Sequence, residues 1–301
     1  MEILPIYNMR STKIFSNPSL KKLIGNTPLI KISPHIYAKL ETYNPSGSIK
    51  DRVIYYITER ARIFGRITEN SILCEATSGN TGIALAMIAA SLGVKCVIFM
   101  PSNMSEERRH MMKIYGALII DAPPHDFAGA ITLRDQYLLA NENAWSPKQF
   151  SNNYNVLCHQ TTTAPEIHKQ IIDTKQRWSA FVHGSGTGGT IEGIRRYLNN
   201  NNLKTKICLT RPKEKEHQIQ GIGDGKDFLF NPDTADRIVE VTSKNAIARA
   251  QEFASKTGIL VGPSSGANLI ASENYVNTMK PDGVVVTMLC DRGERYMSVY
   301  S

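Results

Sequence analysis

The sequence has few cysteines, and their arrangement excludes several kinds of protein. The chain of 301 residues holds 5 cysteines, none in a CxxC pair and none spaced with histidines as zinc ligands are. No metal site is therefore expected. Four of them, Cys74, Cys96, Cys208 and Cys290, lie in apolar runs typical of strands. We therefore expect reduced, buried thiols, which are typical of a cytoplasmic protein.

Long apolar runs are also missing. No run approaches the roughly 20 residues that a membrane span needs, so no membrane association is expected. The N-terminal segment carries charges and Pro5 where a signal peptide needs an apolar core. A signal peptide is therefore not expected, and neither is a C-terminal regulatory domain, because the sequence ends soon after Tyr296.

Acidic residues are outnumbered by basic ones. The chain has 27 Asp and Glu against 35 Lys and Arg, a formal net charge of +8. A basic solvated surface explains this charge, and a preference for anionic ligands or nucleic acid is the alternative. The densest cluster, Arg211, Lys213 and Lys215, alternates with glutamates and a proline. Because no aromatic residues are interleaved with basic ones, a nucleic-acid partner is not expected.

The pattern of apolar residues predicts an α/β fold. Apolar residues make up 42% of the chain, enough for a sizeable core, and the length favours two lobes over one large domain. Strands are predicted at 28–32, 36–41, 72–76, 95–100, 117–121, 180–183, 206–210 and 284–290. Helices are predicted at 48–64, 80–92, 105–115, 129–140, 164–173, 188–199, 243–256 and 264–276. Strands that alternate with helices in this way predict mostly parallel sheets flanked by crossover helices.

A lysine at the start of a predicted helix is the sharpest local feature. Residues 44–52 read Asn-Pro-Ser-Gly-Ser-Ile-Lys-Asp-Arg, a turn followed by a helix that Ser46 or Ser48 would cap. Lys50 would then lie in the first turn, where the helix dipole disfavours a cation. This favours the neutral amine that can form a Schiff base. A solvated lysine is the alternative.

Two glycine-rich loops follow predicted strands and open predicted helices. Residues 77–82, Thr-Ser-Gly-Asn-Thr-Gly, offer hydroxyls, an amide and backbone N–H groups to a carboxylate or phosphate. Residues 184–190, Gly-Ser-Gly-Thr-Gly-Gly-Thr, predict a phosphate cradle, because glycines let the backbone approach a ligand. Tight turns are the alternative for both loops. A dinucleotide site is a further alternative for the second, but the GxGxxG spacing is only loosely met, and no acidic residue ends the next predicted strand.

A third loop completes a recognisable set. Residues 262–268, Gly-Pro-Ser-Ser-Gly-Ala-Asn, add two hydroxyls at the start of a helix. In their order and spacing the lysine segment and the three loops resemble the fold-type II pyridoxal-phosphate (PLP) enzymes, and within them the cysteine synthase and cystathionine β-synthase family. The resemblance covers about residues 20 to 297. Further similar segments lie at 24–29, 101–109, 149–152, 221–223 and 291–296.

The resemblance implies pyridoxal 5'-phosphate as the cofactor and a role for each segment. Lys50 would form the internal aldimine and act as the base at the substrate α-carbon. Asn80 would hydrogen-bond the phenolic oxygen of the cofactor, and Ser264 would face its pyridine nitrogen. The phosphate would be held by Gly184, Gly186, Thr187, Gly188 and Thr190. The substrate carboxylate would be held by Thr77, Ser78, Gly79, Thr81 and Gln149.

The resemblance also implies an architecture and an assembly. Each of two lobes would be a mostly parallel twisted sheet flanked by helices. Residues 48–152 would form a smaller, mobile lobe that carries the carboxylate loop. Residues 1–47 and 153–301 would form a larger lobe with the phosphate and pyridine sites. A homodimer is expected.

Three residues depart from the pattern typical of the family. Asp224 stands where a small residue is usual, so it is a candidate catalytic base for water or an incoming nucleophile, with a solvated loop aspartate as the alternative. His183 precedes the phosphate loop, where a buried structural histidine is favoured over a catalytic one. Arg134, with the stretch around it and the ending at 291–296, resembles the branch that uses O-phosphoserine, where an arginine meets the substrate phosphate, but a surface arginine is the favoured interpretation.

The expected function is β-elimination and β-replacement on a serine or cysteine derivative through an aminoacrylate. The leading hypothesis is a cysteine synthase, in which an activated serine and sulfide give cysteine. The alternatives are breakdown of cysteine to serine and sulfide aided by Asp224, formation of cystathionine, use of O-phosphoserine, and a catalytically silent PLP-binding protein.

Overall fold

Two sheets with helices on both faces make up the fold of the computed structural model, which describes residues 18–223 and 229–301. The larger sheet has six strands in the order β1-β2-β10-β7-β8-β9, and among its strand pairs only β1 and β2 are antiparallel. Its strands are β1 Leu29–Ser33, β2 Ile36–Leu40, β7 Trp178–Gly184, β8 Lys206–Pro212, β9 Arg237–Val241 and β10 Val284–Leu289. The predicted α/β class with mostly parallel sheets is therefore confirmed.

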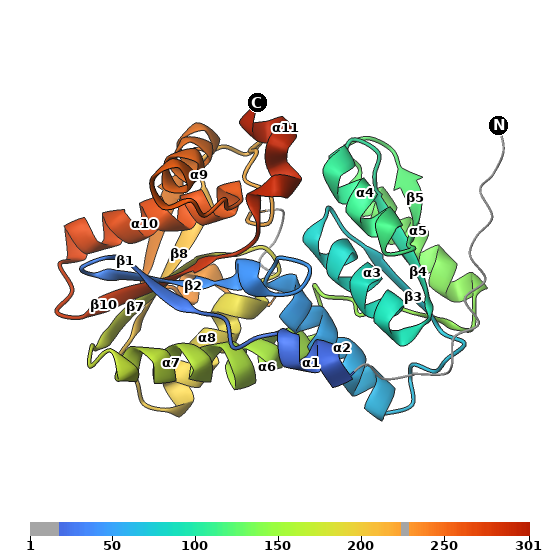
Figure 1. The fold of residues 1–301 in the computed structure, drawn as a ribbon, viewed down its shortest axis with the longest axis horizontal. Helices are drawn as coiled ribbons and strands as arrows, with labels where there is room; N and C mark the ends of the chain where they lie inside the picture. Colours follow the sequence, from blue (N-terminus) through green and yellow to red (C-terminus); the bar gives the residue numbers. More distant parts are fainter. Residues whose placement is uncertain (1–17, 224–228) are drawn as a thin grey trace.

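The smaller sheet is parallel throughout and has the order β5-β4-β3-β6. Its strands are β3 Ile72–Ala76, β4 Lys95–Pro101, β5 Leu118–Ala122 and β6 Ala144–Trp145. In Figure 1 this sheet and the helices α3, α4 and α5 lie on the right, and the larger sheet lies on the left.

Helices connect the strands and cover the sheets. The α-helices are α1 Pro18–Leu23, α2 Lys50–Ile63, α3 Asn80–Leu92, α4 Glu106–Ile114, α5 Phe127–Ala140, α6 Asn153–Cys158, α7 Ala164–Asp173, α8 Gly189–Asn200, α9 Ser243–Thr257, α10 Pro263–Met279 and α11 Met297–Tyr300. The shorter helical segments are η1 Glu41–Tyr43, η2 His159–Thr163, η3 Pro232–Thr234 and η4 Gly293–Tyr296. In the part of the chain that the structure describes, no helix is long and apolar enough to span a bilayer.

Apolar side chains fill both faces of each sheet. On the smaller sheet, Ile54 of α2 and Ile83 of α3 pack with Leu73 on one face, while Ala130 of α5 packs with Phe99 on the other. The larger sheet has one core against α7 and α8 and another against α9 and α10. Strands covered on both faces read as continuous apolar runs, which is why β3, β4, β7 and β10 are visible in the sequence.

Helices α2 and α6 link the two sheets. Helix α2 packs on α3 of the smaller sheet and on α6, and α6 packs on α8 of the larger sheet. The strands follow the predicted division, because β3 to β6 fall within 48–152 and the other strands fall outside it. The lobe boundaries and the mobility of the smaller lobe stay predictions. All five cysteines are buried free thiols.

Candidate active site

Helix α2 begins at the lysine that the sequence singles out. Lys50 is its first residue, and the Ser48 hydroxyl accepts a hydrogen bond from the Lys50 backbone N–H at 3.2 Å. Neither Ser46 nor Ser48 caps the helix as predicted, because Ile49 is the residue before its first turn and no side chain caps it. The Ser46 backbone N–H donates to the Asp51 carboxylate at 2.6 Å, and its carbonyl accepts from Arg295 at 2.7 Å. The turn before Lys50 is thus held from both sides.

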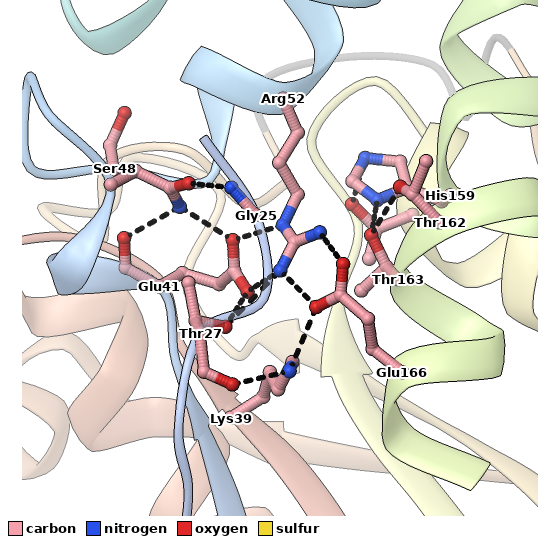
Figure 2. Close-up of polar contacts among 12 residues, drawn as sticks. Gly25, Thr27, Lys39, Glu41, Ser48, Arg52, His159, Thr162, Thr163 and Glu166 are labelled. Carbon is pink, nitrogen blue, oxygen red and sulfur yellow. Dashed lines mark hydrogen bonds and ion pairs between the residues drawn. The ribbon is translucent and has the colours of Figure 1, made fainter. Parts of the chain in front are cut away.

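A buried polar network fixes α2 against the larger sheet (Figure 2). The Arg52 guanidinium lies between two carboxylates, with Nε 2.7 Å from Glu41 and Nη1 2.7 Å from Glu166 of α7. Lys39 of β2 adds an ion pair with Glu166 at 2.9 Å and donates to the carbonyl of Thr27 at 2.6 Å. These contacts join Thr27, Glu41 and Arg52, which lie in three separate segments, in one network.

The charges of this network are balanced inside the protein. Burial alone would raise the pKa of Glu41, but the charges of Arg52 and Lys39 and the hydrogen bonds from Arg52 and Thr27 together outweigh it, and the pKa is lowered. Buried ion pairs add little net stability, yet losing one partner leaves a costly uncompensated charge. The network therefore constrains geometry above all, and it fixes the position from which Lys50 projects, two residues before Arg52.

Lys50 lies on the wall of a cavity at the carboxyl end of β7. The cavity is also lined by the predicted cofactor residues Asn80, Gly184, Gly186, Thr187, Gly188, Thr190 and Ser264. Ligands of parallel sheets bind at the carboxyl ends of strands. The structure thus brings together, from four distant segments, every residue for which the sequence predicts a contact with the cofactor.

The donors in this cavity suit a phosphate and an aldehyde. Gly188 has a φ of 80° and precedes α8, whose first turn is not capped by any side chain. Backbone N–H groups at such a helix start bind anions. No Asp or Glu of the described residues lines the cavity, and Lys50 brings a primary amine to it. The residues present therefore fit PLP.

Side chains behind the loop hold its two threonines. The Thr187 hydroxyl accepts from Asn155 at 2.9 Å, and the Thr190 hydroxyl lies 3.2 Å from Nε2 of His159. Burial, with the nearby charges of Arg52 and Lys50, lowers the pKa of His159 well below its usual value. His159 is therefore a neutral hydrogen-bond partner near the phosphate site, a contact that the sequence did not predict.

A second cavity adjoins the first and shares Lys50 and Asn80 with it. It is lined by the predicted carboxylate residues Thr77, Ser78, Gly79, Thr81 and Gln149. The hydroxyl of Thr81 donates to the Gln149 side chain at 2.7 Å, so two segments far apart in sequence meet as predicted. No Asp or Glu from the described part of the chain lines this cavity either.

Arg108 of α4 is a wall residue that the sequence did not identify as functional. Its side chain is only 2% exposed, it donates to Gln220, and its guanidinium carbon lies 4.5 Å from the ring centre of Tyr296. Its Nε has no hydrogen-bond partner. A Cβ on Gly79 would lie 2.6 Å from Arg108 Cδ, so the glycine lets the arginine pack against the carboxylate loop.

Asn80 joins the smaller sheet to the last segment of the chain. Its amide nitrogen donates to Asp291 at 2.6 Å, and its amide oxygen accepts from Arg295 at 2.5 Å. The Tyr296 hydroxyl also donates to Asp291 at 2.5 Å. The amide nitrogen has two hydrogens, so one of them stays available to a ligand in the cofactor cavity.

His183 and Cys290 line the cofactor cavity without carrying charge. Burial, with the nearby charge of Lys50, lowers the pKa of His183 to about 3, and its Nδ1 lies 3.3 Å from the Asn268 amide. Burial raises the pKa of the Cys290 thiol to about 12. At neutral pH both groups are uncharged, and the buried, hydrogen-bonded histidine favoured by the sequence fits this geometry.

Arg134 lies neither on the surface nor at the site. It is buried, forms an ion pair with Glu75 at 2.7 Å, and lines neither cavity. The interpretation as a surface residue is therefore wrong, and a contact with a substrate phosphate finds no support. Asp224, the candidate base, lies outside the described residues.

Comparisons with known proteins agree with this geometry. Residues 20–291 match the family described as pyridoxal-phosphate dependent enzyme. A probable cysteine synthase of Bacillus subtilis is 37% identical over 304 aligned residues, which cover 95% of this chain and 97% of that protein.

Two solved structures extend the likeness to the fold. An O-acetylserine dependent cystathionine β-synthase from Helicobacter pylori superposes with a TM-score of 0.86 at 31% identity, covering 94% of this chain and 98% of that one. A hydrogen sulfide-producing enzyme from Fusobacterium nucleatum gives a TM-score of 0.87 at 35% identity, covering 93% and 89%.

Proposed function

Since the chain belongs to the family of pyridoxal-phosphate dependent enzymes, and within it to the cysteine synthases, we propose that it makes cysteine from an activated serine and sulfide. It is a PLP enzyme of β-replacement and β-elimination, like its relatives. We propose that its substrate is an activated serine, and that the reaction forms cysteine instead of breaking it down.

One observation carries this proposal: the lysine, the carboxylate loop and the phosphate loop line two adjoining cavities that share Lys50. An amino acid held in the second cavity by its carboxylate would lie beside the amine of Lys50. The bound cofactor supplies an electron sink that stabilises negative charge at the substrate α-carbon. The protein has to place the amino acid, move one proton and keep the anions in place.

We assign these tasks to particular groups. Lys50 would take the proton from the α-carbon, since it lines both cavities. The loop from Thr77 to Thr81, with Gln149, binds the carboxylate, and Arg108 adds a positive charge to the same wall. The backbone of residues 184–190 and the hydroxyls of Thr187 and Thr190 bind the cofactor phosphate. Ser264 would meet the pyridine nitrogen of the bound cofactor as a neutral group, which would favour loss of a β-substituent over transamination.

Product analysis tests the proposed direction. The purified holoenzyme would be incubated with sulfide and one of three donors: O-acetylserine, O-phosphoserine or serine. Cysteine formed from one activated serine, lost in Lys50→Ala and kept in Lys31→Ala, an exposed lysine in the middle of β1, would support the proposal. Cysteine formed from no donor would contradict it.

Breakdown of cysteine is the second candidate. It is favoured by the likeness to the hydrogen sulfide-producing enzyme of Fusobacterium nucleatum, and we propose Asp224 as the base that would activate water. In this case cysteine alone would release sulfide and give serine, and Asp224→Asn would lose this activity. The hypothesis that O-phosphoserine is the substrate is no longer supported by Arg134, because this arginine forms an ion pair with Glu75.

We propose further that the enzyme is a cytoplasmic homodimer whose smaller lobe, residues 48–152, closes over the substrate. Buried free thiols suit a reducing compartment. Large apolar side chains, Leu23, Ile63 and Phe64, are about 60% exposed at the ends of α1 and α2, which suits a subunit interface. Sedimentation of the native protein and of Phe64→Ser would test the dimer.

A further inference from the structure

A groove lies at the carboxyl end of β8, beside the phosphate loop, where it shares Ser185 with the cofactor cavity. It encloses about 430 Å³, within the range of small-molecule sites. Apart from Ser185, none of its lining residues lines the cofactor or substrate cavity. The polar and basic residues of its wall are Ser185, Thr210, Arg211, Lys213, Lys215 and His217.

Two buried hydroxyls in this groove have no hydrogen-bond partner. Thr210 is 1% exposed and Ser185 is 5% exposed, and the side-chain oxygen of each is unpaired. The Nδ1 atom of His217 is buried and unpaired as well. Unsatisfied buried polar groups are costly and rare in native proteins. All three residues line the groove, so a ligand that offers several acceptor oxygens there is a candidate partner for them.

The charges around the groove favour an anion. None of Arg211, Lys213 and Lys215 forms an ion pair with a described residue. Two carboxylates also line the groove, but Glu214 accepts from the backbone N–H of Ser243 at 3.1 Å, where α9 begins. The exposed Glu240 is the other. The three cations still exceed the two carboxylates, so the lining of the groove keeps a net positive charge.

The segment that bears these cations is held in place by its backbone. Strand β8 pairs with β9 up to Pro212, and the N–H of Lys213 donates to the Val241 carbonyl at 3.0 Å. The N–H of Gln218 donates to the Ser243 hydroxyl at 2.9 Å. A backbone that is already in place lowers the entropic cost of binding a ligand.

We propose that this groove binds a small tetrahedral oxyanion, either inorganic (phosphate or sulfate) or the phosphate of a phosphomonoester. The hydroxyls of Thr210 and Ser185 donate to it, as does His217 in the tautomer that carries hydrogen on Nδ1, and the three cations neutralise its charge. The site is separate from the cofactor phosphate, and the proposal does not depend on which β-reaction the enzyme performs.

The groove is coupled to the cofactor through one shared residue. Ser185 lines both spaces, and its carbonyl accepts from the Gly223 N–H at 2.8 Å. An oxyanion bound to its hydroxyl would restrain the phosphate loop from behind. Occupancy of the groove is therefore expected to tighten cofactor binding.

Calorimetry on the PLP-saturated protein tests the proposal. Inorganic phosphate, sulfate and glycerol phosphate are titrated into the native protein, Thr210→Val, Lys213→Gln and the control Lys204→Gln. Lys204 is an exposed lysine just before the opposite end of β8, so its replacement makes the same charge change away from the groove. Removing the Thr210 hydroxyl should weaken binding at least about tenfold, as for a hydrogen bond to a charged group.

Removing the Lys213 charge should weaken binding about two- to fivefold, as for an exposed charge, and Lys204→Gln should bind like the native protein. If glycerol phosphate binds more tightly, the natural ligand is a phosphomonoester. If phosphate or sulfate binds more tightly, the natural ligand is the inorganic ion. No binding to the native holoenzyme, or equal binding by native, Thr210→Val and Lys213→Gln proteins, would overturn the proposal. Because Lys213 is exposed, its variant still tests the proposal even where Thr210→Val fails to fold.

Discussion

Arg108 brings a positive charge to the substrate cavity and not to the cofactor cavity. It lines the second cavity but not the first, and no described carboxylate forms an ion pair with it. A buried guanidinium without a fixed counter-ion strengthens the binding of an anion more than an exposed one, because little water screens it. Its contribution should therefore appear in substrate binding and not in cofactor binding.

Replacing Arg108 by methionine should raise the KM for the amino-acid substrate at least about tenfold, with a small change in the affinity for PLP. Steady-state kinetics and a cofactor titration measure the two effects. Arg109→Met is the matched control, because Arg109 follows on the same helix and pairs with Asp121 at 2.7 Å instead. Equal KM values for the two variants would remove Arg108 from the substrate site.

Asp51 makes stability depend on pH. Burial raises its pKa to about 7 from an ordinary 3.8, against the opposing hydrogen bonds from Ser46 and the charge of Arg295. Between these two values the folded protein holds a proton that the unfolded chain releases. Stability from this group is therefore lost as the pH rises from about 4 to 7, and changes no further above that.

Asp51→Asn should remove this slope. Its free energy of unfolding should fall less between about pH 5 and pH 8 than that of the native protein, by an amount on the order of a few kcal/mol. Urea unfolding at the two pH values measures the difference. The same pH dependence in both proteins would show that Asp51 does not titrate in this range.

At the scale of elements, the phosphate loop is locked against the segment after β8. A Cβ on Gly186 would lie 2.4 Å from the carbonyl oxygen of Gly221, closer than any side chain tolerates. Gly186→Ala must therefore push the two segments apart, which should weaken PLP binding at least about tenfold. Fluorescence titration of the apoprotein with PLP measures the affinity.

Gly93→Ala is the control for this prediction. Gly93 has a φ of 69° at the end of α3, and nothing lies within 4 Å of a Cβ there. Its replacement should lower stability by about 1–2 kcal/mol, because a left-handed φ disfavours a residue with a Cβ, and leave PLP affinity unchanged. If both alanine variants bind PLP equally well, the close approach of the two segments does not shape the cofactor site.

The ion pair between Arg134 of α5 and Glu75 of β3 joins a helix to the sheet beneath it. Both side chains are buried, at 7% and 0% exposure. Arg134→Met leaves an uncompensated carboxylate and should cost about 3–5 kcal/mol of stability, most of it recovered by adding Glu75→Gln. Urea unfolding measures both. Were Arg134→Met instead to raise the KM for O-phosphoserine alone, Arg134 would be a substrate residue after all.

Helices and strands could be predicted where the sequence marks them with a clear apolar run or a helix start. Strand β3 and helices α3 and α7 have the predicted bounds, because a buried apolar run or a helix start marks each. Strand β9, Arg237–Val241, was missed because it is an edge strand with alternating exposed and buried residues and two charges. Strand β6 was missed because a strand of two residues, Ala144–Trp145, carries no pattern.

At the scale of the whole molecule, the sequence predicted the loops that line the cavities better than the residues that pack around these loops. The loops that line the cavities have distinctive glycine and hydroxyl patterns, so Lys50, Asn80 and Ser264 were identifiable from the sequence. Arg108 and His159 reach the site through packing between elements distant in the sequence, which no local pattern reveals. Arg134 was misjudged for the same reason, since its partner lies 59 residues away.

The central claim is that the two cavities form one active site in which PLP attaches to Lys50. The direct test is to reduce the PLP-loaded protein with borohydride, digest it and locate the cofactor by peptide mass spectrometry. The account predicts one pyridoxyl group per chain, on the peptide that contains Lys50. A cofactor attached to another lysine, or to none, would contradict it.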